Sequence, residues 1–337
     1  MTVRESVPLS ALTTFKIGGN ASYVIECADD ADIREALAFA EEKKLPWCLL
    51  GQGSNLLASD GGYDGVVIRP LASGISITED ETGALVVADA GYPWDELVRE
   101  ACERNLWGIE NLAGIPGTAG AAPVQNIGAY GTELADTLLW VEAMNPESGE
   151  SLRIPKEACA FGYRDSRFKH ENLIILRIAL HLSKTPAPNL SYKDLAALAA
   201  SGASLDTPAK VADAVRGIRA KKFPDLAEWG TAGSFFKNPV IPVREFEKLK
   251  ERYPELPGFP GSDGVKVPLA WILDRLLSLR GFSGRKTKLF EAQPLVVVAE
   301  KGASAQDVEN IAGDVAARVK DATGIELEWE VRALPKK

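Results

Sequence analysis

A run of small residues, NLAGIPGTAGAAPVQNIGAYG from Asn111 to Gly131, constrains the fold more than any other feature of this sequence. Gly lacks a Cβ and tolerates positive φ, so repeated Gly and Ala let main-chain N–H groups approach a bulky anionic ligand. A structureless loop of this length inside a compact domain is uncommon and is usually functional. The run therefore predicts a ligand-binding loop, with an ordinary surface loop as the alternative.

Length and composition limit the class of protein. A chain of 337 residues is too long for one ordinary domain, so we expect two or three packed units. The formal net charge of -9, without a long run of Lys or Arg, argues against nucleic acid or an anionic membrane as the main partner. The chain has only two histidines, so we expect no metal centre.

The cysteines and the N-terminus predict a cytoplasmic protein. The cysteines are far apart and include no C-x-x-C pair, which favours buried thiols in a reducing compartment: Cys27, Cys48, Cys102 and Cys159. The N-terminus lacks the apolar core of a secretory signal. The most apolar later stretch, Leu173 to Leu182, is interrupted by Arg177 and His181. We therefore expect a soluble protein.

Hydrophobic periodicity predicts alternating strands and helices. Helices are expected over Asp29–Lys44, from Pro93 to Arg104, and over Thr207–Lys221, Phe246–Tyr253, Leu269–Leu279 and Gln306–Asp321. Strands are expected over Ser22–Glu26, Trp47–Leu50, Val66–Arg69, Ala84–Ala90, Leu173–Leu182, Leu295–Val298 and Ile325–Arg332.

A second small-residue motif, Gly51-Gln-Gly-Ser-Asn55, follows a predicted strand. Successive N–H groups in such a loop form a nest that binds phosphate. The motif is neither a dinucleotide-binding fingerprint, because Leu56 occupies the place of the last glycine, nor a P-loop, because no Walker lysine follows. An ordinary tight turn is an equally good interpretation of this motif alone.

Two motifs carry charged groups suited to a carboxylate or enolate. Phe161-Gly-Tyr-Arg-Asp-Ser166 places Arg164 beside a phenol and a carboxylate, and Arg suits a bidentate grip on a carboxylate. A structural Arg–Asp pair is the alternative. Glu330 and Arg332 share one face of the last predicted strand, which is either part of a site or merely solvated.

Ser234, in Thr231-Ala-Gly-Ser-Phe-Phe-Lys-Asn-Pro239, follows a glycine and has two interpretations. Paired with Lys237 it resembles the Ser-x-x-Lys nucleophile of penicillin-recognising enzymes. Those enzymes also need a Ser-Asp-Asn and a Lys-Thr-Gly element. This chain has Ser262-Asp-Gly264 and Lys286-Thr-Lys288 instead, and each differs from the required element at its last residue. Alternatively, Ser234 donates a proton to a strongly basic carbanion.

Six motifs together resemble the UDP-N-acetylenolpyruvoylglucosamine reductase family. They occur in that family's order over nearly the whole chain: Thr13–Gly19, Gly51–Asn55, Gly114–Gly131, Phe161–Ser166, Ala232–Pro239 and Glu330–Arg332. The segment between Asn238 and Val265 resembles the longer type of this enzyme, which carries a substrate-covering loop.

The resemblance implies an α+β protein with an FAD-binding fold of the vanillyl-alcohol-oxidase / p-cresol methylhydroxylase type. Residues 1–69 and 70–223 would form two α/β FAD-binding subdomains, and the C-terminal strand within 324–337 would return to the second. Residues 224–323 would form an α/β substrate-binding domain.

The resemblance also implies the reaction. NADPH would reduce FAD, and the enolpyruvyl ether of UDP-N-acetylglucosamine would then accept hydride to give UDP-N-acetylmuramate. This places the enzyme in peptidoglycan precursor synthesis, and thus in cell-wall biogenesis, cell shape and cell division. We expect a cytoplasmic monomer that needs no nucleic acid, membrane or metal.

Family motifs assign roles residue by residue. Ser234 would donate the proton, and Arg164 and Glu330 would stabilise the enolate. The expected FAD contacts are Gly51, Gln52, Gly53, Ser54, Asn55, Gly114, Ile115, Pro116, Gly117, Thr118, Ala121, Ala122, Gln125, Tyr163 and Arg332. The expected substrate contacts are Tyr192, Lys222, Asn238, Phe259 and Gln293. Phe259 stands where the longer type usually has tyrosine, so we expect slightly weaker substrate binding because one neutral hydrogen bond contributes about 1 kcal/mol.

Overall fold

The chain folds into two units, which a computed structural model describes over residues 1–335. Unit 1 comprises Met1–Val7, Ala21–Gln52 and Asp64–Ala220. Unit 2 comprises Pro8–Asn20, Gly53–Tyr63 and the chain from Lys221 onward. We expected three segments divided near residues 69 and 223. Unit 1 continues across residue 69, and the division into three segments stays a prediction.

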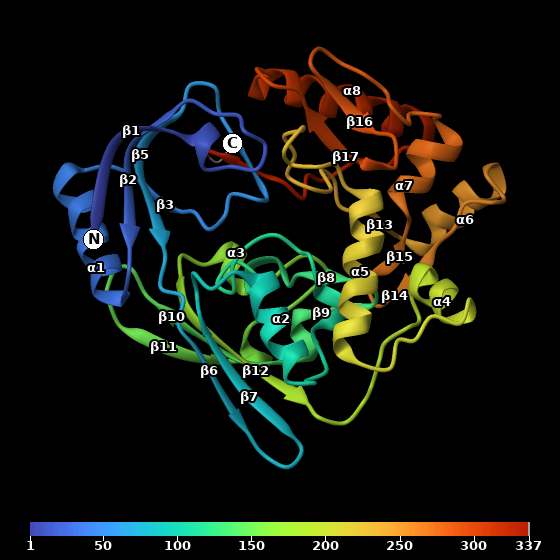
Figure 1. The fold of residues 1–337 in the computed structure, drawn as a ribbon. Helices are drawn as coiled ribbons and strands as arrows, with labels where there is room; N and C mark the ends of the chain where they lie inside the picture. The colour runs from blue at the N-terminus through green and yellow to red at the C-terminus, as the bar shows by residue number, and fades with distance from the viewer. Residues whose placement is uncertain (336–337) are drawn as a thin grey trace. The chain divides into compact units, whose positions relative to one another are not determined.

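The first sheet of unit 1 packs against helix α1 (Asp30–Lys43), close to the predicted helix. Asp29 caps this helix by accepting the Asp32 N–H at 2.9 Å, and Lys44 ends it at φ 55°. The buried face of α1 packs on strands β2 and β5 (Figure 1). The sheet has the order β1 (Thr2–Pro8), β2 (Asn20–Cys27), β5 (Tyr63–Pro70) and β3 (Trp47–Leu49).

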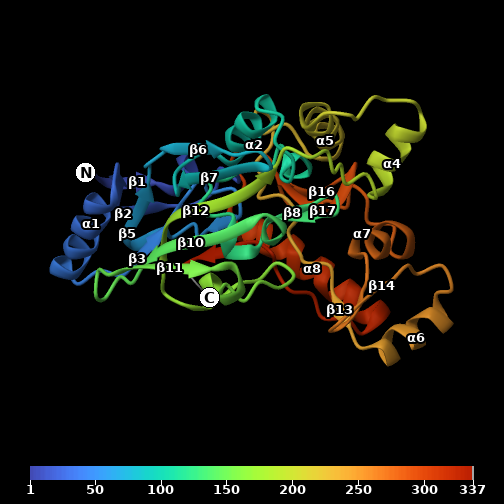
Figure 2. The same ribbon diagram turned by 90° about the horizontal axis from the view of Figure 1, so that it is seen from below.

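The second sheet of unit 1 is antiparallel, and helix α2 (Trp94–Glu103) lies beside it (Figure 2). Trp94 and Leu97 of this helix are buried in the same core as the sheet. Its order is β11 (Ser151–Pro155), β10 (Leu138–Met144), β12 (Ile174–Ser183), β7 (Gly83–Asp89) and β6 (Ile75–Glu79). The shorter elements are β8 (Gly128–Ala129), β9 (Thr132–Glu133), α3 (Arg167–His170) and α4 (Lys193–Ala200), and α5 (Pro208–Lys222) runs into unit 2.

Arg177 explains how a charged residue fits in the most apolar predicted strand. It lies on β12 and forms ion pairs with Asp30 at 2.9 Å, Asp89 at 3.1 Å and Glu142 at 3.3 Å. The three carboxylates come from the start of α1 and from the neighbouring strands β7 and β10. No helix among the described residues is both long and apolar enough to cross a membrane.

Unit 2 contains small sheets and helices around a core that includes buried Phe15, Phe235 and Phe236. β13 (Val240–Ile241), β15 (Gly264–Lys266) and β14 (Phe259–Gly261) pair antiparallel in that order, and β16 (Thr287–Phe290) pairs with β17 (Gln293–Ala299). The helices are α6 (Val243–Arg252), α7 (Leu269–Trp271, continued by a π-helical turn Ile272–Leu276) and α8 (Ala305–Thr323). Ser304 and Asp307 form a capping box at the start of α8.

The C-terminal segment differs from its prediction. Only Arg332–Leu334 forms a strand, β18, and it pairs in parallel with β4 (Leu56–Ala58) rather than with the 70–223 segment. Leu327, Trp329 and Val331 alternate because their side chains pack on the unit 2 core. The main chain from 325 to 328 is irregular, and Trp329 forms an isolated antiparallel bridge with Phe236. Period-two burial therefore suggested a strand where the backbone does not form one.

Candidate active site

Unit 2 brings three of the predicted motifs together around Thr14. The Thr14 hydroxyl donates to the Thr231 carbonyl oxygen at 2.6 Å, and the Thr14 N–H donates to the Gly53 carbonyl oxygen at 3.1 Å. The Thr231 N–H returns a bond to the Thr14 carbonyl oxygen at 3.1 Å. The motifs at 13–19, 53–55 and 231–239 therefore form one cluster.

The fourth motif joins this cluster beside Ser234. The Phe235 carbonyl oxygen accepts the Glu330 N–H at 2.8 Å, and the Glu330 carbonyl oxygen accepts the Asn55 side-chain amide at 3.1 Å. The Arg332 N–H donates to the Asn55 carbonyl oxygen at 3.1 Å. Ser234 and Glu330 are both half-buried, and main-chain hydrogen bonds connect their segments. The structure thus places the predicted proton donor next to the Glu330 segment.

Lys237 bears on the acyl-transfer alternative. Its ammonium forms an ion pair with Glu328, and its N–H donates to the Glu328 carbonyl oxygen at 3.0 Å. In a Ser-x-x-Lys site the lysine must be free to act on the serine as a base. The ion pair with Glu328 occupies the Lys237 ammonium and weighs against that role.

The other predicted substrate residues of unit 2 differ in exposure. Phe259 on β14 is 58% exposed, and Gln293 begins β17. The Asn238 side-chain oxygen accepts the Leu269 N–H at 2.9 Å and so caps α7. Lys222 ends α5. Their substrate contacts stay predictions.

In unit 1, Arg164 occupies a strained turn. Gly162 and Asp165 exchange main-chain hydrogen bonds of 3.0 and 3.2 Å, and Arg164 between them has φ 54°. An L-residue other than Gly pays roughly 1–2 kcal/mol for this left-handed conformation. The guanidinium donates to the Gly128 carbonyl oxygen at 2.7 Å and lies 5.5 Å from the centre of the Tyr163 ring. Such strain in a non-glycine residue is typical of functional sites.

Two predicted cofactor loops of unit 1 also face each other. Gln52 Oε1 accepts the Gly117 N–H at 3.0 Å. A Cβ on Gly51 would lie 3.2 Å from Thr118 Oγ1 and 3.9 Å from Ala121 Cβ. None of these five residues carries a carboxylate, and all but Gln52 are small, so the main chain lies close to whatever binds there. The residues present fit an anionic dinucleotide such as FAD.

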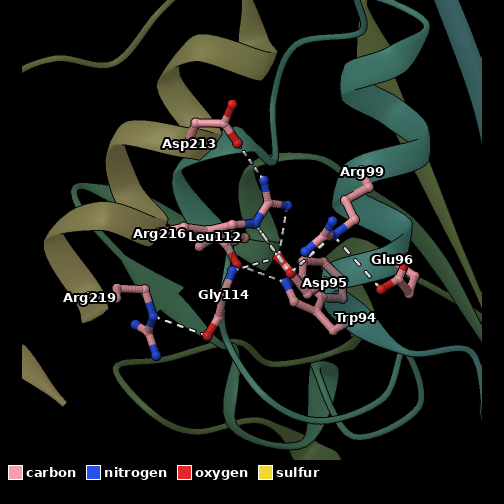
Figure 3. Close-up of polar contacts among 9 residues, drawn as sticks. All are labelled: Trp94, Asp95, Glu96, Arg99, Leu112, Gly114, Asp213, Arg216 and Arg219. Atoms are coloured by element: carbon pink, nitrogen blue, oxygen red, sulfur yellow. Dashed lines mark hydrogen bonds and ion pairs between the residues drawn. The ribbon is translucent and has the colours of Figure 1, made fainter. Parts of the chain in front are cut away.

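The Gly114 end of the loop is held by residues that the sequence analysis did not single out. Gly114 N–H donates to Asp95 Oδ1 at 2.6 Å, and Arg219 Nε donates to the Gly114 carbonyl oxygen at 3.1 Å (Figure 3). Arg216 binds Asp95 at 3.0 Å. Burial alone would raise the pKa of Asp95, but the Arg216 and Gly114 hydrogen bonds hold that pKa below its ordinary value. The only sequence signal was an acidic residue in the first turn of α2, which resembles ordinary helix stabilisation.

Asn111 organises the other end of the small-residue run. Its side-chain amide donates to the Tyr130 and Asn189 carbonyl oxygens, both at 2.8 Å, while its buried Oδ1 has no partner among the described residues. Tyr130 stacks edge-on against Tyr192 with ring centres 5.0 Å apart. Burial raises the pKa of Tyr130 to about 12. The run therefore also supports the predicted substrate residue Tyr192.

The predicted site residues divide between the units. Unit 2 holds Ser234, Glu330, Arg332, Gly53, Ser54, Asn55, Lys222, Asn238, Phe259 and Gln293. Unit 1 holds Arg164, Tyr163, Tyr192, Gly51, Gln52, Gly114, Ile115, Pro116, Gly117, Thr118, Ala121, Ala122 and Gln125.

Comparisons with known proteins agree with these motifs. The family described as "FAD binding domain" matches residues 21–154, and "UDP-N-acetylenolpyruvoylglucosamine reductase, C-terminal domain" matches residues 225–334. The chain is 38% identical to the UDP-N-acetylenolpyruvoylglucosamine reductase of Pasteurella multocida over 96% of this chain and 95% of the relative. Identity to the Pseudomonas aeruginosa reductase is also 38%, over 97% and 98%.

This chain belongs to the UDP-N-acetylenolpyruvoylglucosamine reductase family.

The crystal structure of the Thermus caldophilus reductase is similar throughout, with a TM-score of 0.68 and 25% identity over 98% of this chain and 99% of that one. Membership of the reductase family confirms the predicted resemblance and the predicted α+β fold with an FAD-binding domain. It also confirms the predicted enzyme class, an FAD-containing oxidoreductase. The roles of individual residues in this reductase stay proposals.

Proposed function

We propose that this protein reduces the enolpyruvyl ether of UDP-N-acetylglucosamine to UDP-N-acetylmuramate with NADPH as the electron donor. The names of its relatives and their match over almost the whole chain support this substrate. The enzyme would act as a cytoplasmic monomer in peptidoglycan precursor synthesis. The observation that carries the proposal is the Phe235–Glu330 main-chain hydrogen bond, because it sets Ser234 beside the Glu330 segment.

Ser234 is the proposed proton donor. Bound FAD supplies the hydride that the substrate's methylene carbon accepts. The Ser234 O–H then donates its proton to the adjacent carbon, which is basic enough to take a proton from an aliphatic hydroxyl. The half-buried position of Ser234 restricts access of water, a competing proton source.

Arg164 is the proposed partner of the substrate carboxylate, and Arg164 and Glu330 together would stabilise the enolate. The planar guanidinium of Arg164 suits bidentate binding of a carboxylate, and the Gly128 carbonyl oxygen fixes its orientation. Stabilisation of the enolate by Glu330 requires its carboxyl to donate a hydrogen bond there. Tyr192, Lys222, Asn238, Phe259 and Gln293 would hold the UDP portion, with Lys222 supplying positive charge.

The visible spectrum of the anaerobic protein tests this function. NADPH is added first and the enolpyruvyl UDP-sugar second. We expect the oxidised flavin absorption to be bleached by NADPH and to recover on addition of the sugar. UDP-N-acetylglucosamine is the matched control, because it lacks the enolpyruvyl group and should leave the flavin bleached. A flavin that is bleached but does not recover with the enolpyruvyl sugar would refute the proposed substrate.

A further inference from the structure

Both main-chain polar groups of Gly114 are bound by side chains from two helices. Asp95, the second residue of α2, accepts the Gly114 N–H at 2.6 Å. Arg219 on α5 donates to the Gly114 carbonyl oxygen at 3.1 Å. Figure 3 shows the two side chains approaching Gly114 from different helices. Neither helix contributes to the cofactor loop itself, so these contacts fix the loop from outside.

Arg216 completes this arrangement by holding Asp95. Its Nε lies 3.2 Å from both carboxylate oxygens of Asp95, and a second guanidinium nitrogen lies 3.0 Å from Oδ1. Arg216 also donates to Asp213 at 3.1 Å, one turn earlier on α5. A guanidinium can make these bonds at once because its donors are planar and fixed. The Asp95 carboxylate is thereby held with one oxygen toward the loop.

The space around Gly114 is as restricted as its hydrogen bonds. Gly114 has φ +69°, and a Cβ there would lie 3.3 Å from Arg219 Cδ and 3.5 Å from Arg216 Cγ. The Leu112 carbonyl oxygen accepts the Trp94 indole N–H at 3.1 Å, which ties the preceding residues to α2 as well. The loop at 112–114 is therefore fixed at two points before it reaches Gly117 and Thr118.

We infer that Asp95 and Arg216 are positioning residues for FAD, because they fix the Gly114 end of the loop whose next residues would bind the cofactor. The inference rests on the proposed role of Gly114–Thr118 in holding FAD. Preorganised main chain binds a ligand more tightly because less conformational freedom is lost on binding. Loosening the Gly114 peptide should therefore weaken FAD binding without removing any group that contacts FAD.

The test compares Asp95→Asn with Glu96→Gln. Asn keeps the shape of Asp95 but places an amide donor toward the donors of Arg216. Glu96 is the neighbouring acidic residue on α2, and its ion-pair partner is Arg99, at 3.7 Å. The dissociation constant of FAD is measured by flavin fluorescence on apoprotein prepared from each holoenzyme. We expect Asp95→Asn to raise it about tenfold, the effect of losing one charge-assisted hydrogen bond, and Glu96→Gln to leave it unchanged.

Two further measurements separate this inference from its premises. Turnover at saturating FAD should be close to the original value in Asp95→Asn, because the reacting groups are intact. An unchanged FAD dissociation constant with a lowered unfolding midpoint would show that Asp95 only joins α2 to α5, and would overturn the inference. Thr118→Val tests the loop itself: weaker FAD binding in Thr118→Val but not in Asp95→Asn would reject the positioning role alone, whereas no change in either would reject the loop assignment.

Failure of the proposed substrate reaction can be distinguished from failure of the inference about FAD binding. FAD binding is measured without NADPH or sugar, so it does not depend on the proposed substrate. If Asp95→Asn proves too unstable to purify, Arg216→Lys keeps the charge but loses the fork that holds both oxygens of Asp95. We expect Arg216→Lys to weaken FAD binding as well, and unchanged binding there would contradict the inference.

Discussion

Gly114 in unit 1 and Gly233 in unit 2 have similar backbones but different surroundings. Their φ angles are +69° and +78°, both in the left-handed region that favours glycine. Gly114 is enclosed by the side chains of Arg216 and Arg219, whereas a Cβ on Gly233 would meet nothing within 4 Å. The first glycine is needed for its conformation and for space, and the second for its conformation alone.

The two turns are also held together differently. The Gly233 N–H donates to Thr231 Oγ1, two residues earlier, at 3.2 Å, and the following residues are held by main-chain bonds to Leu295 and Glu330. The Gly114 peptide depends on side chains from residues 95 and 219. A turn with a local contact and main-chain support tolerates side-chain changes nearby. A turn held by distant side chains fails when one of them changes.

The largest expected effect is at Ser234, where the open turn carries the proposed chemistry. Ser234→Ala should slow reoxidation of the reduced flavin by the enolpyruvyl sugar by about 10²–10⁴-fold, the usual contribution of a general acid. Reduction by NADPH should be unaffected. Stopped-flow absorbance of the two half-reactions measures both rates. Ser283→Ala is the control for loss of a hydroxyl in unit 2, because the Ser283 hydroxyl donates to the nearby Gly281 carbonyl oxygen. Undiminished reoxidation would remove Ser234 from the mechanism.

The matched pair Gly114→Ala and Gly233→Ala tests the comparison directly. Each variant incurs about 1–2 kcal/mol for the left-handed conformation. Gly114→Ala should lose about 1 kcal/mol more, because the Arg219 side chain must move from its hydrogen bond. The effect on the unfolded chain is the same in both, so the difference reports the native surroundings. Urea denaturation gives the two free energies of unfolding, and equal values would contradict the comparison.

The same contrast explains what could be predicted from sequence. The Ser234 turn is contained in one contiguous motif, and the Gly, Ser and Lys in it already indicated a functional serine. The support of Gly114 comes from Asp95 and Arg219, which are 19 and 105 residues away. Asp95 looks like a favourable charge in the first turn of a helix, and Arg219 like a solvated residue near a helix end. Only the packing of α2 and α5 reveals their common target.

Local sequence signals predicted helix α1 correctly but were misleading for the segment 325–331. Helix α1 could be predicted because its Asp29 cap, apolar face and C-terminal lysines are local signals. The segment 325–331 was predicted as a continuous strand because alternating burial of Leu327, Trp329 and Val331 has the period of a strand, but it forms only an isolated antiparallel bridge at Trp329. Burial patterns report which side chains face a core, but they do not report which main-chain groups are paired.

A smaller effect is expected at Phe259, an exposed residue in unit 2. Phe259→Tyr adds a phenolic hydroxyl where the longer enzymes of this family usually have one. One neutral hydrogen bond of about 1 kcal/mol should lower the KM for the enolpyruvyl sugar about fivefold. Steady-state kinetics at saturating NADPH measures this, and kcat should change little. An unchanged KM would show that this part of unit 2 gains nothing from a side-chain hydrogen bond.

The smallest expected effect is at Asp80, which binds a glycine peptide as Asp95 does but in solvent. Its carboxylate accepts the Thr82 hydroxyl and N–H, both at 2.7 Å, and the Gly83 N–H at 2.9 Å. These hydrogen bonds, led by the Thr82 hydroxyl, lower the pKa of Asp80 to about 2. A folded-state pKa below the ordinary 3.8 stabilises the fold fully above about pH 4, and this stabilisation is lost as the pH falls through about 2.

NMR titration of the side-chain carboxyls tests this difference between exposed and enclosed contacts. Asp80 should still be largely ionised near pH 3, where an ordinary aspartate is mostly protonated. Asp80→Asn should lower the free energy of unfolding slightly at about pH 6, and by less at about pH 3, because acid has begun to remove the same contribution from the original protein. If Asp80 has the ordinary aspartate pKa, its solvent-exposed hydrogen bonds do not hold the turn. Holding a turn would then require an enclosed carboxylate such as Asp95.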